Sequence, residues 1–266
     1  KIMSDGFFRY PAAGPLEKPA DLERLQALPA RCPWILRQVE LVRRVVELQP
    51  DTPYFYNIFS PATSLRFLVG RAALTDWLKS APEAVAEALA RMGRGLAALA
   101  EAVLTAGGAD GIYLSVQNPD LRRVTDGDYA RLLKPADLAP LAAANAAGGR
   151  NILHICGYEG ARNNLAVWAD YPAQAFSWAV NVEGVSLGRG KELFGGRAVI
   201  GGFANGPGAL IAAGSRPEIE AFTKSLLAEA GRTGVIIGAD CTLPADIRLE
   251  RLEWVRLQAA AGSVAF

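Results

Sequence analysis

The strongest constraint on the fold is an alternation of short apolar runs with longer helical stretches from residue 50 onward. The short runs are mostly rich in Ile, Val, Tyr or Phe and predict strands at residues 53–59, 111–116, 151–156, 175–180, 198–202 and 235–239. Helical patterns are predicted between and after them, at residues 61–79, 82–106, 126–147, 184–194, 217–230 and 246–260. Repeated βα units of this kind indicate an α/β protein with a parallel sheet.

Six strands that are each followed by a helix favour a (β/α)8 TIM-type barrel over an open doubly wound sheet, because no G-x-G-x-x-G motif opens a helix. Closure needs eight strands, whereas residues 1–50 supply only two helical stretches, at 22–27 and 34–48. The chain also begins without Met. We therefore expect one or two N-terminal βα units to be absent from this chain, and residues 1–266 to form a single barrel domain.

Charge and cysteine content exclude several classes of protein. The 28 Lys and Arg residues balance 27 Asp and Glu residues and are scattered, so a nucleic acid is not an expected partner. There is no apolar run long enough to span a bilayer and no signal-peptide pattern at the N-terminus, so we expect a cytoplasmic protein without a membrane partner. Three cysteines cannot build a disulfide framework, so any that matter should act as thiolates.

The most informative motif is a His and a Cys at the end of an apolar run. His154 and Cys156 are two residues apart in Asn-Ile-Leu-His-Ile-Cys-Gly, so on a strand their side chains face the same side. Cys241 follows another apolar run, in Gly-Ala-Asp-Cys-Thr-Leu-Pro. In a barrel the C-terminal ends of all strands meet at one rim, where active sites lie.

One imidazole and two thiolates suit tetrahedral zinc with one coordination position left open, which is the pattern of catalytic zinc sites. The alternative interpretation is that His154 is a core histidine and that both cysteines are small buried hydrophobic residues. Cys32, beside Pro33 in a helical stretch, has no neighbouring ligand and is interpreted as structural.

Four segments together resemble the uroporphyrinogen decarboxylase superfamily, and within it the zinc-dependent, corrinoid-linked methyltransferases. They are Leu-His-Ile-Cys-Gly at 153–157, Gly-Ala-Asp-Cys-Thr-Leu-Pro at 238–244, Met-Ser-Asp-Gly-Phe-Phe-Arg at 3–9 and Ala-Gly-Gly-Ala-Asp-Gly-Ile at 106–112. The resemblance implies a (β/α)8 barrel. It also implies that His154, Cys156 and Cys241 bind zinc and carry catalysis.

The function implied is transfer of a methyl group from a methylated corrinoid, carried on a partner protein, to a thiol such as coenzyme M or to another acceptor such as tetrahydrofolate. One alternative is decarboxylation of a tetrapyrrole, as in the metal-free branch of the family. Cys241 stands where that branch carries a His, and this difference favours a metal. A second alternative is a non-catalytic barrel that binds a corrinoid.

Carboxylates and polar side chains near strand ends are the remaining candidates. Glu183 and Asp240 are the nearest carboxylates along the chain, and Glu183 is the expected fourth zinc ligand of the resting enzyme. Alternating polar residues on one strand share a face and could line a pocket. The candidate substrate-binding residues are Tyr113, Ser115, Gln117, Asn181 and Asp240. The glycine-rich run at 201–208 is interpreted either as an anion-binding loop or as a tight turn.

Overall fold

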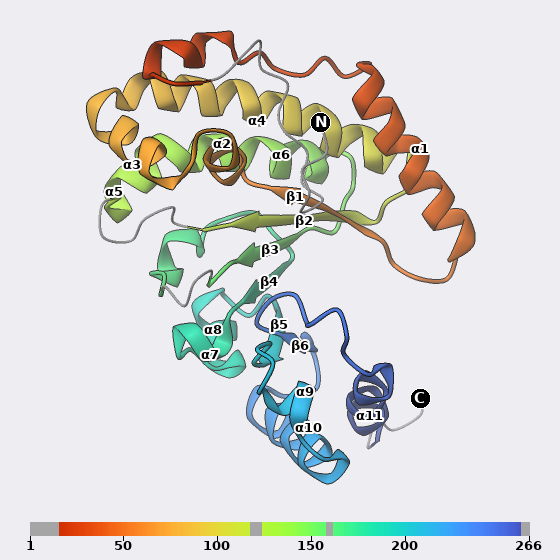
Figure 1. Cartoon of the computed structure of the whole chain (residues 1–266). Coiled ribbons are helices and arrows are strands. Elements are labelled where there is room, and N and C mark those ends of the chain that lie inside the picture. Colours follow the sequence, from red (N-terminus) through yellow and green to blue (C-terminus); the bar gives the residue numbers. More distant parts are fainter. Residues whose placement is uncertain (1–15, 118–123, 158–161, 262–266) are drawn as a thin grey trace. The chain divides into compact units, whose positions relative to one another are not determined.

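A computed structural model of the protein describes residues 16–117, 124–157 and 162–261. Its six strands run parallel in one sheet, in chain order (Figure 1). The strands are β1 (Phe55–Phe59), β2 (Gly111–Val116), β3 (Ile152–Ile155), β4 (Ala175–Trp178), β5 (Ala198–Phe203) and β6 (Val235–Ala239). All six predicted strands are present, and the α/β class is confirmed. The arrangement is consistent with a partial TIM barrel.

Within the described residues, an α-helix follows every strand except β3, which is followed by a short 3-10 helix. The α-helices are α1 (Pro33–Leu48), α2 (Pro61–Val69), α3 (Arg71–Ser80), α4 (Pro82–Thr105), α5 (Asp126–Asp128), α6 (Lys134–Ala146), α7 (Val180–Glu183), α8 (Leu187–Leu193), α9 (Leu210–Ala213), α10 (Arg216–Ala230) and α11 (Leu249–Ala260). Short 3-10 helices form η1 (Pro19–Arg24) and η4 (Leu165–Trp168), and a π-helical turn forms η2 (Tyr129–Leu133).

The chain divides into two compact units. The first unit comprises Lys1–Leu153 and Tyr171–Ala173, and the second comprises His154–Asp170 and Gln174–Phe266. The expectation of a single domain stays a prediction.

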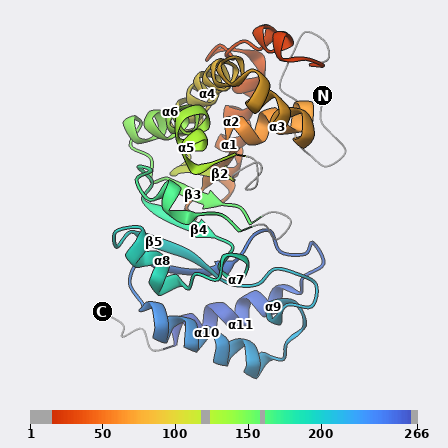
Figure 2. The ribbon, with the colours of Figure 1, turned by 90° about the vertical axis from the view of Figure 1, so that its left-hand side faces the viewer.

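In the first unit, α4 and α6 lie side by side next to β1 and β2 (Figure 2). The helix α4 begins at Pro82, whose missing N–H costs nothing at a first helical position. One stripe of α4 is buried, and it includes Val85, Leu89, Met92 and Leu96. Gly93 lets the two helices approach closely, because a Cβ there would lie 2.8 Å from the carbonyl oxygen of Ala136.

In the second unit, β4 is buried at all four of its positions, whereas β6 is only partly covered. The helices α10 and α11 lie beside β6 and pack around Phe203, Ile211 and Ile219. The helix α11 has no fully buried residue, and Ile236 of β6 is 54% exposed. The last strand and the last helix are thus the most loosely covered part of this unit.

Local backbone features explain three of the differences between the predicted and the observed boundaries. The predicted helix 61–79 is broken at Gly70, whose φ of 85° ends α2 and precedes α3. The predicted strand 175–180 ends at Trp178, because Val180 already begins α7. The predicted helix 184–194 begins only at Leu187, since Gly184 adopts a left-handed conformation at the end of α7.

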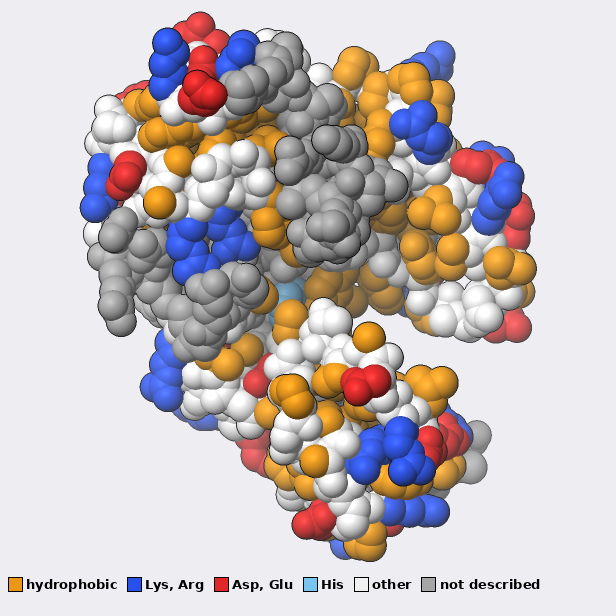
Figure 3. Space-filling view, viewed as in Figure 1, with side chains coloured by type: hydrophobic (Ala, Val, Ile, Leu, Met, Phe, Trp, Pro, Cys, Tyr) orange, Lys and Arg blue, Asp and Glu red, His pale blue; other side chains and the backbone are white. Residues whose placement is uncertain are grey.

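Among the described residues, none of the helices combines the length and the apolar character that crossing a membrane requires. Lys and Arg side chains stand in small groups among Asp and Glu side chains on the face drawn in Figure 3.

Candidate metal centre

His154 is a polar residue in a strand that is otherwise apolar. The strand β3 is buried at all four positions, and His154 is only 3% exposed. Its Nδ1 atom lies 3.1 Å from Oγ of Ser177, which is itself buried on β4. This hydrogen bond holds the imidazole ring in one orientation. In metal sites, a hydrogen bond to one ring nitrogen commonly orients the histidine whose other nitrogen binds the metal.

Cys156 follows the last residue of β3, and Cys241 lies shortly after the end of β6. Because the strands are parallel, both residues lie at the C-terminal edge of the sheet. One nitrogen of His154 and the two Sγ atoms lie within 4.8 Å of one another. The structure therefore brings together the three residues that the sequence singled out.

The three donors differ in exposure and in charge. His154 is buried, Cys156 is half-buried and Cys241 is exposed, so the group opens toward solvent on the Cys241 side. Hydrogen bonding to Cys156, and then to His154, holds the pKa of the Cys241 thiol well below its usual range. A thiolate is the form of cysteine that binds metals and acts as a nucleophile.

Two carboxylates of the second unit are held by asparagines. Both oxygens of Glu183 accept hydrogen bonds from Asn163, one from Nδ2 at 2.6 Å and one from the backbone N–H at 2.7 Å. Asp240, beside Cys241, accepts from the backbone N–H of Asn181 at 3.1 Å and from its Nδ2 at 3.1 Å. Burial raises the pKa of both carboxyl groups, and these hydrogen bonds oppose that shift.

Neither carboxylate belongs to the group formed by His154 and the two cysteines. Glu183 as a fourth ligand therefore stays a prediction. The hydrogen bonds between Asn181 and Asp240 connect the start of α7 to the end of β6. Nδ2 of Asn181 also donates to the carbonyl oxygen of Gly202 at 3.3 Å.

Glycines next to these residues allow close packing. A Cβ on Gly157 would lie 2.6 Å from Cβ of Ala179, and one on Gly202 would lie 2.6 Å from Cδ1 of Leu226. Within the glycine-rich run at 201–208, Gly201 and Gly202 belong to β5 and have positive φ values. Backbone conformation and close packing therefore explain why glycine occupies these two positions.

The other candidate substrate residues belong to the first unit. Ser115 lies on β2 and Gln117 just beyond it, and both are buried, whereas Tyr113 is half-buried. With its amide oxygen turned toward Arg66, Gln117 accepts hydrogen bonds from Nη1 at 3.2 Å and Nη2 at 2.9 Å. Arg66 itself is a buried cation on α2. Their roles in binding a substrate stay predictions.

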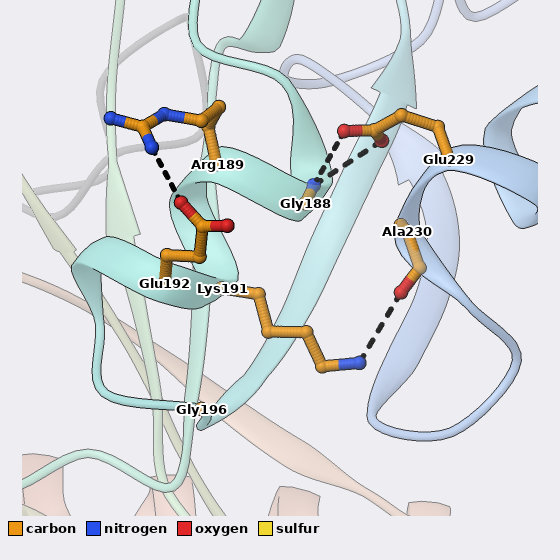
Figure 4. A pocket seen from close by; sticks show the side chains of 7 residues that line it. All are labelled: Gly188, Arg189, Lys191, Glu192, Gly196, Glu229 and Ala230. Carbon is orange, nitrogen blue, oxygen red and sulfur yellow. Dashed lines mark hydrogen bonds and ion pairs between the residues drawn. The ribbon is translucent and has the colours of Figure 1, made fainter.

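A hollow of about 440 Å³ in the second unit is lined by charged residues (Figure 4). Glu229 accepts from the backbone N–H of Gly188 and from Ser186, at the start of α8. Lys191 donates to the carbonyl oxygens of Ala230 and Thr233, at the end of α10. These charges cap helix ends, so this hollow is explained by the fold.

Ser177 and Asn163 were missed from the sequence. A signal for Ser177 existed, because it is the one polar residue in the buried strand Ala-Phe-Ser-Trp, which neighbours the strand of His154. No comparable pattern marks Asn163, which belongs to an irregular segment. The segment 3–9 lies outside the described residues.

These features define an α/β protein with a candidate metal centre at the C-terminal ends of parallel strands. The model of the uroporphyrinogen decarboxylase (URO-D) family matches residues 10–259, and the chain therefore belongs to this family. Members of the family are enzymes, either decarboxylases or methyltransferases. The family resemblance predicted from the sequence is confirmed. No curated protein matches the chain.

Proposed function

We propose that the protein is a zinc-dependent methyltransferase of the URO-D family, with His154, Cys156 and Cys241 as zinc ligands. The observation that carries this proposal is the convergence of the three donor atoms within 4.8 Å. His154 and Cys156 are neighbours at one strand end, whereas Cys241 comes from a distant part of the chain, so its sulfur meets their donor atoms only in the folded protein. A set of two thiolates and one imidazole matches the donors of catalytic zinc sites.

A zinc ion held there would supply a Lewis acid at which an incoming thiol loses its proton at neutral pH. The chain's own residues would prepare that position. Ser177 orients the imidazole of His154, and the exposure of Cys241 leaves one side of the group open to an acceptor. Asp240, fixed by Asn181, holds the backbone immediately before Cys241.

The methyl donor in this proposal is a methylated corrinoid carried on a partner protein. The acceptor is a thiol such as coenzyme M, or tetrahydrofolate. In the transfer to a thiol, the acceptor sulfur forms a bond to the methyl carbon while the cobalt–carbon bond breaks, and the electron pair of that bond stays on cobalt. Glu183 is the proposed fourth ligand in the absence of an acceptor.

Metal analysis of the purified chain tests this function. We expect about one zinc per chain, as a single three-ligand site implies, and demethylation of free methylcobalamin that depends on an added thiol. Cys241→Ser should lose both the metal and the activity, whereas Cys32→Ser should keep both, because Cys32 lies in the first unit at the start of α1.

A chain purified without chelator that holds no zinc, and that takes none up on titration, would contradict the proposal. Release of carbon dioxide from a polycarboxylated tetrapyrrole by such a metal-free chain would instead identify the decarboxylase alternative. Corrinoid binding without turnover would identify the non-catalytic one.

A further inference from the structure

Cys156 and Cys241 also form a close pair of thiols in this structure. Their Sγ atoms lie within 4.8 Å of each other, while the S–S bond of a disulfide is about 2.05 Å long. A modest shift would therefore bring the two sulfurs into bonding distance.

Both cysteines lie beyond the last residues of their strands, and on the Cys241 side the shift falls beyond Asp240, which Asn181 holds in place. β3 ends before Cys156 and β6 ends before Cys241, so neither residue belongs to a strand or a helix. The strand that leads to Cys241 is also the least covered of the second unit. Segments with few buried contacts move at low free-energy cost.

An oxidant in solution can reach this pair from one side. Cys241 is exposed and Cys156 is half-buried, while His154 lies behind them in the core. Susceptibility to peroxide follows exposure, and it rises when a second thiol stands ready to resolve the first product.

We propose that Cys156 and Cys241 are a site of reversible oxidation, at which hydrogen peroxide joins the two sulfurs as a disulfide and withdraws both from metal binding. The withdrawal of a metal rests on the proposed function, whereas the bond between the two sulfurs does not.

The reaction proceeds in two displacements. The Cys241 thiolate attacks one peroxide oxygen, so an S–O bond forms, the O–O bond breaks, and the other oxygen takes up a proton and leaves as water. The Cys156 thiolate then attacks the Cys241 sulfur, the S–S bond forms, and the S–O bond breaks with loss of a second water after another proton is taken up. The two sulfurs lose two electrons, which the peroxide gains, and a dithiol reverses the change.

The test treats the full chain, metal-free and zinc-loaded, with one equivalent of hydrogen peroxide. Free thiols are counted, and peptides are mapped by mass spectrometry without reduction. We expect two of the three thiols to disappear, a peptide pair joined through Cys156 and Cys241, and recovery of both thiols with dithiothreitol. In the zinc-loaded chain a colorimetric chelator should detect released zinc in step with thiol loss.

Two variants serve as controls. Cys32→Ser should lose both of its remaining thiols with the same time course, because Cys32 takes no part. Cys156→Ser should form no bond within the chain, and its Cys241 should end as a sulfenic or sulfinic acid or as a link between two chains.

Loss of thiols without the 156–241 link, or a link that involves Cys32, would overturn the inference. The two proposals fail in different ways. A chain that forms the link but never binds zinc contradicts the zinc enzyme alone, and a chain that binds zinc but forms no link in either state contradicts the oxidation site alone.

Discussion

At the scale of single residues, the hydrogen bond between Ser177 and His154 should tune the affinity for zinc. Removing the Ser177 hydroxyl leaves Nδ1 of His154 without this partner in a buried place, so the ring loses its fixed orientation. We expect Ser177→Ala to weaken zinc binding by about 10- to 100-fold, the range typical of such outer partners. Competition with a chelator of known affinity measures this.

Ser177→Thr keeps a hydroxyl at the same position and provides the control. Ser177→Thr should bind zinc more tightly than Ser177→Ala, with an affinity closer to that of the parent. If Ser177→Ala binds zinc as tightly as the parent, the hydrogen bond seen here does not position the ligand.

The sequence predicted the three donor residues but not their supporting partners. His154, Cys156 and Cys241 could be found because His and Cys are rare in this chain and stand at the ends of apolar runs. Ser and Asn are more frequent in this chain than His and Cys and serve many purposes, so Asn163 carries no distinctive signal. The polar position of Ser177 in a buried strand is a signal, but it does not name His154 as the partner. Their roles depend on which strands and loops become neighbours, and the order of residues alone does not state that.

At the scale of elements, the contact between the end of β3 and the start of α7 depends on Gly157. A methyl group there would lie 2.6 Å from Cβ of Ala179 and 3.2 Å from Cβ of Val182, too close for either to stay in place. We expect Gly157→Ala to push Cys156 or α7 aside and to lower zinc affinity at least several-fold, as judged by the same chelator competition.

Gly206→Ala is the matched control in the same unit, because a Cβ at Gly206 has no neighbour within 4 Å. It should bind zinc as the parent does. Equal affinities for both variants would show that the packing of α7 does not set the position of Cys156.

Element boundaries were predictable only where a strong local signal existed. Pro82 begins α4 and the predicted limits of β2 and β6 were right, because apolar runs there end at polar or glycine residues. The helix predicted at 126–147 instead contains the π-helical turn η2, followed by α6. That turn accompanies the hydrogen bond between Tyr129 and the buried Asp137, a tertiary contact that hydrophobic periodicity does not encode.

At the scale of the whole molecule, Asp137 should make stability depend on pH. Its side chain is fully buried, and one carboxyl oxygen accepts hydrogen bonds from Tyr129 at 2.7 Å and Tyr171 at 2.9 Å. Burial raises the pKa of Asp137 to about 7. The unfolded chain therefore loses this proton at lower pH than the folded chain does, so the free energy of unfolding should fall as pH rises from about 4 to about 7, and then level off.

Asp137→Asn cannot ionise and should not show this contribution. The free energy of unfolding is measured in urea at several values between pH 5 and pH 8. As pH rises, the parent should lose stability relative to the Asp137→Asn variant. Asp76→Asn, at an exposed position on α3, controls for the exchange of Asp for Asn itself. A parent and an Asp137→Asn variant with parallel pH profiles would show that Asp137 does not titrate in this range.

The order of the three donors along the chain has a consequence for biosynthesis. Ribosomes deliver His154 and Cys156 long before Cys241, which follows the last strand of the sheet. A nascent chain thus offers a metal ion only two of the three donors, His154 and Cys156, until translation has passed β6. Under the proposed ligand set, a messenger cut short before that point yields a polypeptide unable to retain zinc, and tightly held metal becomes a mark that translation has passed Cys241.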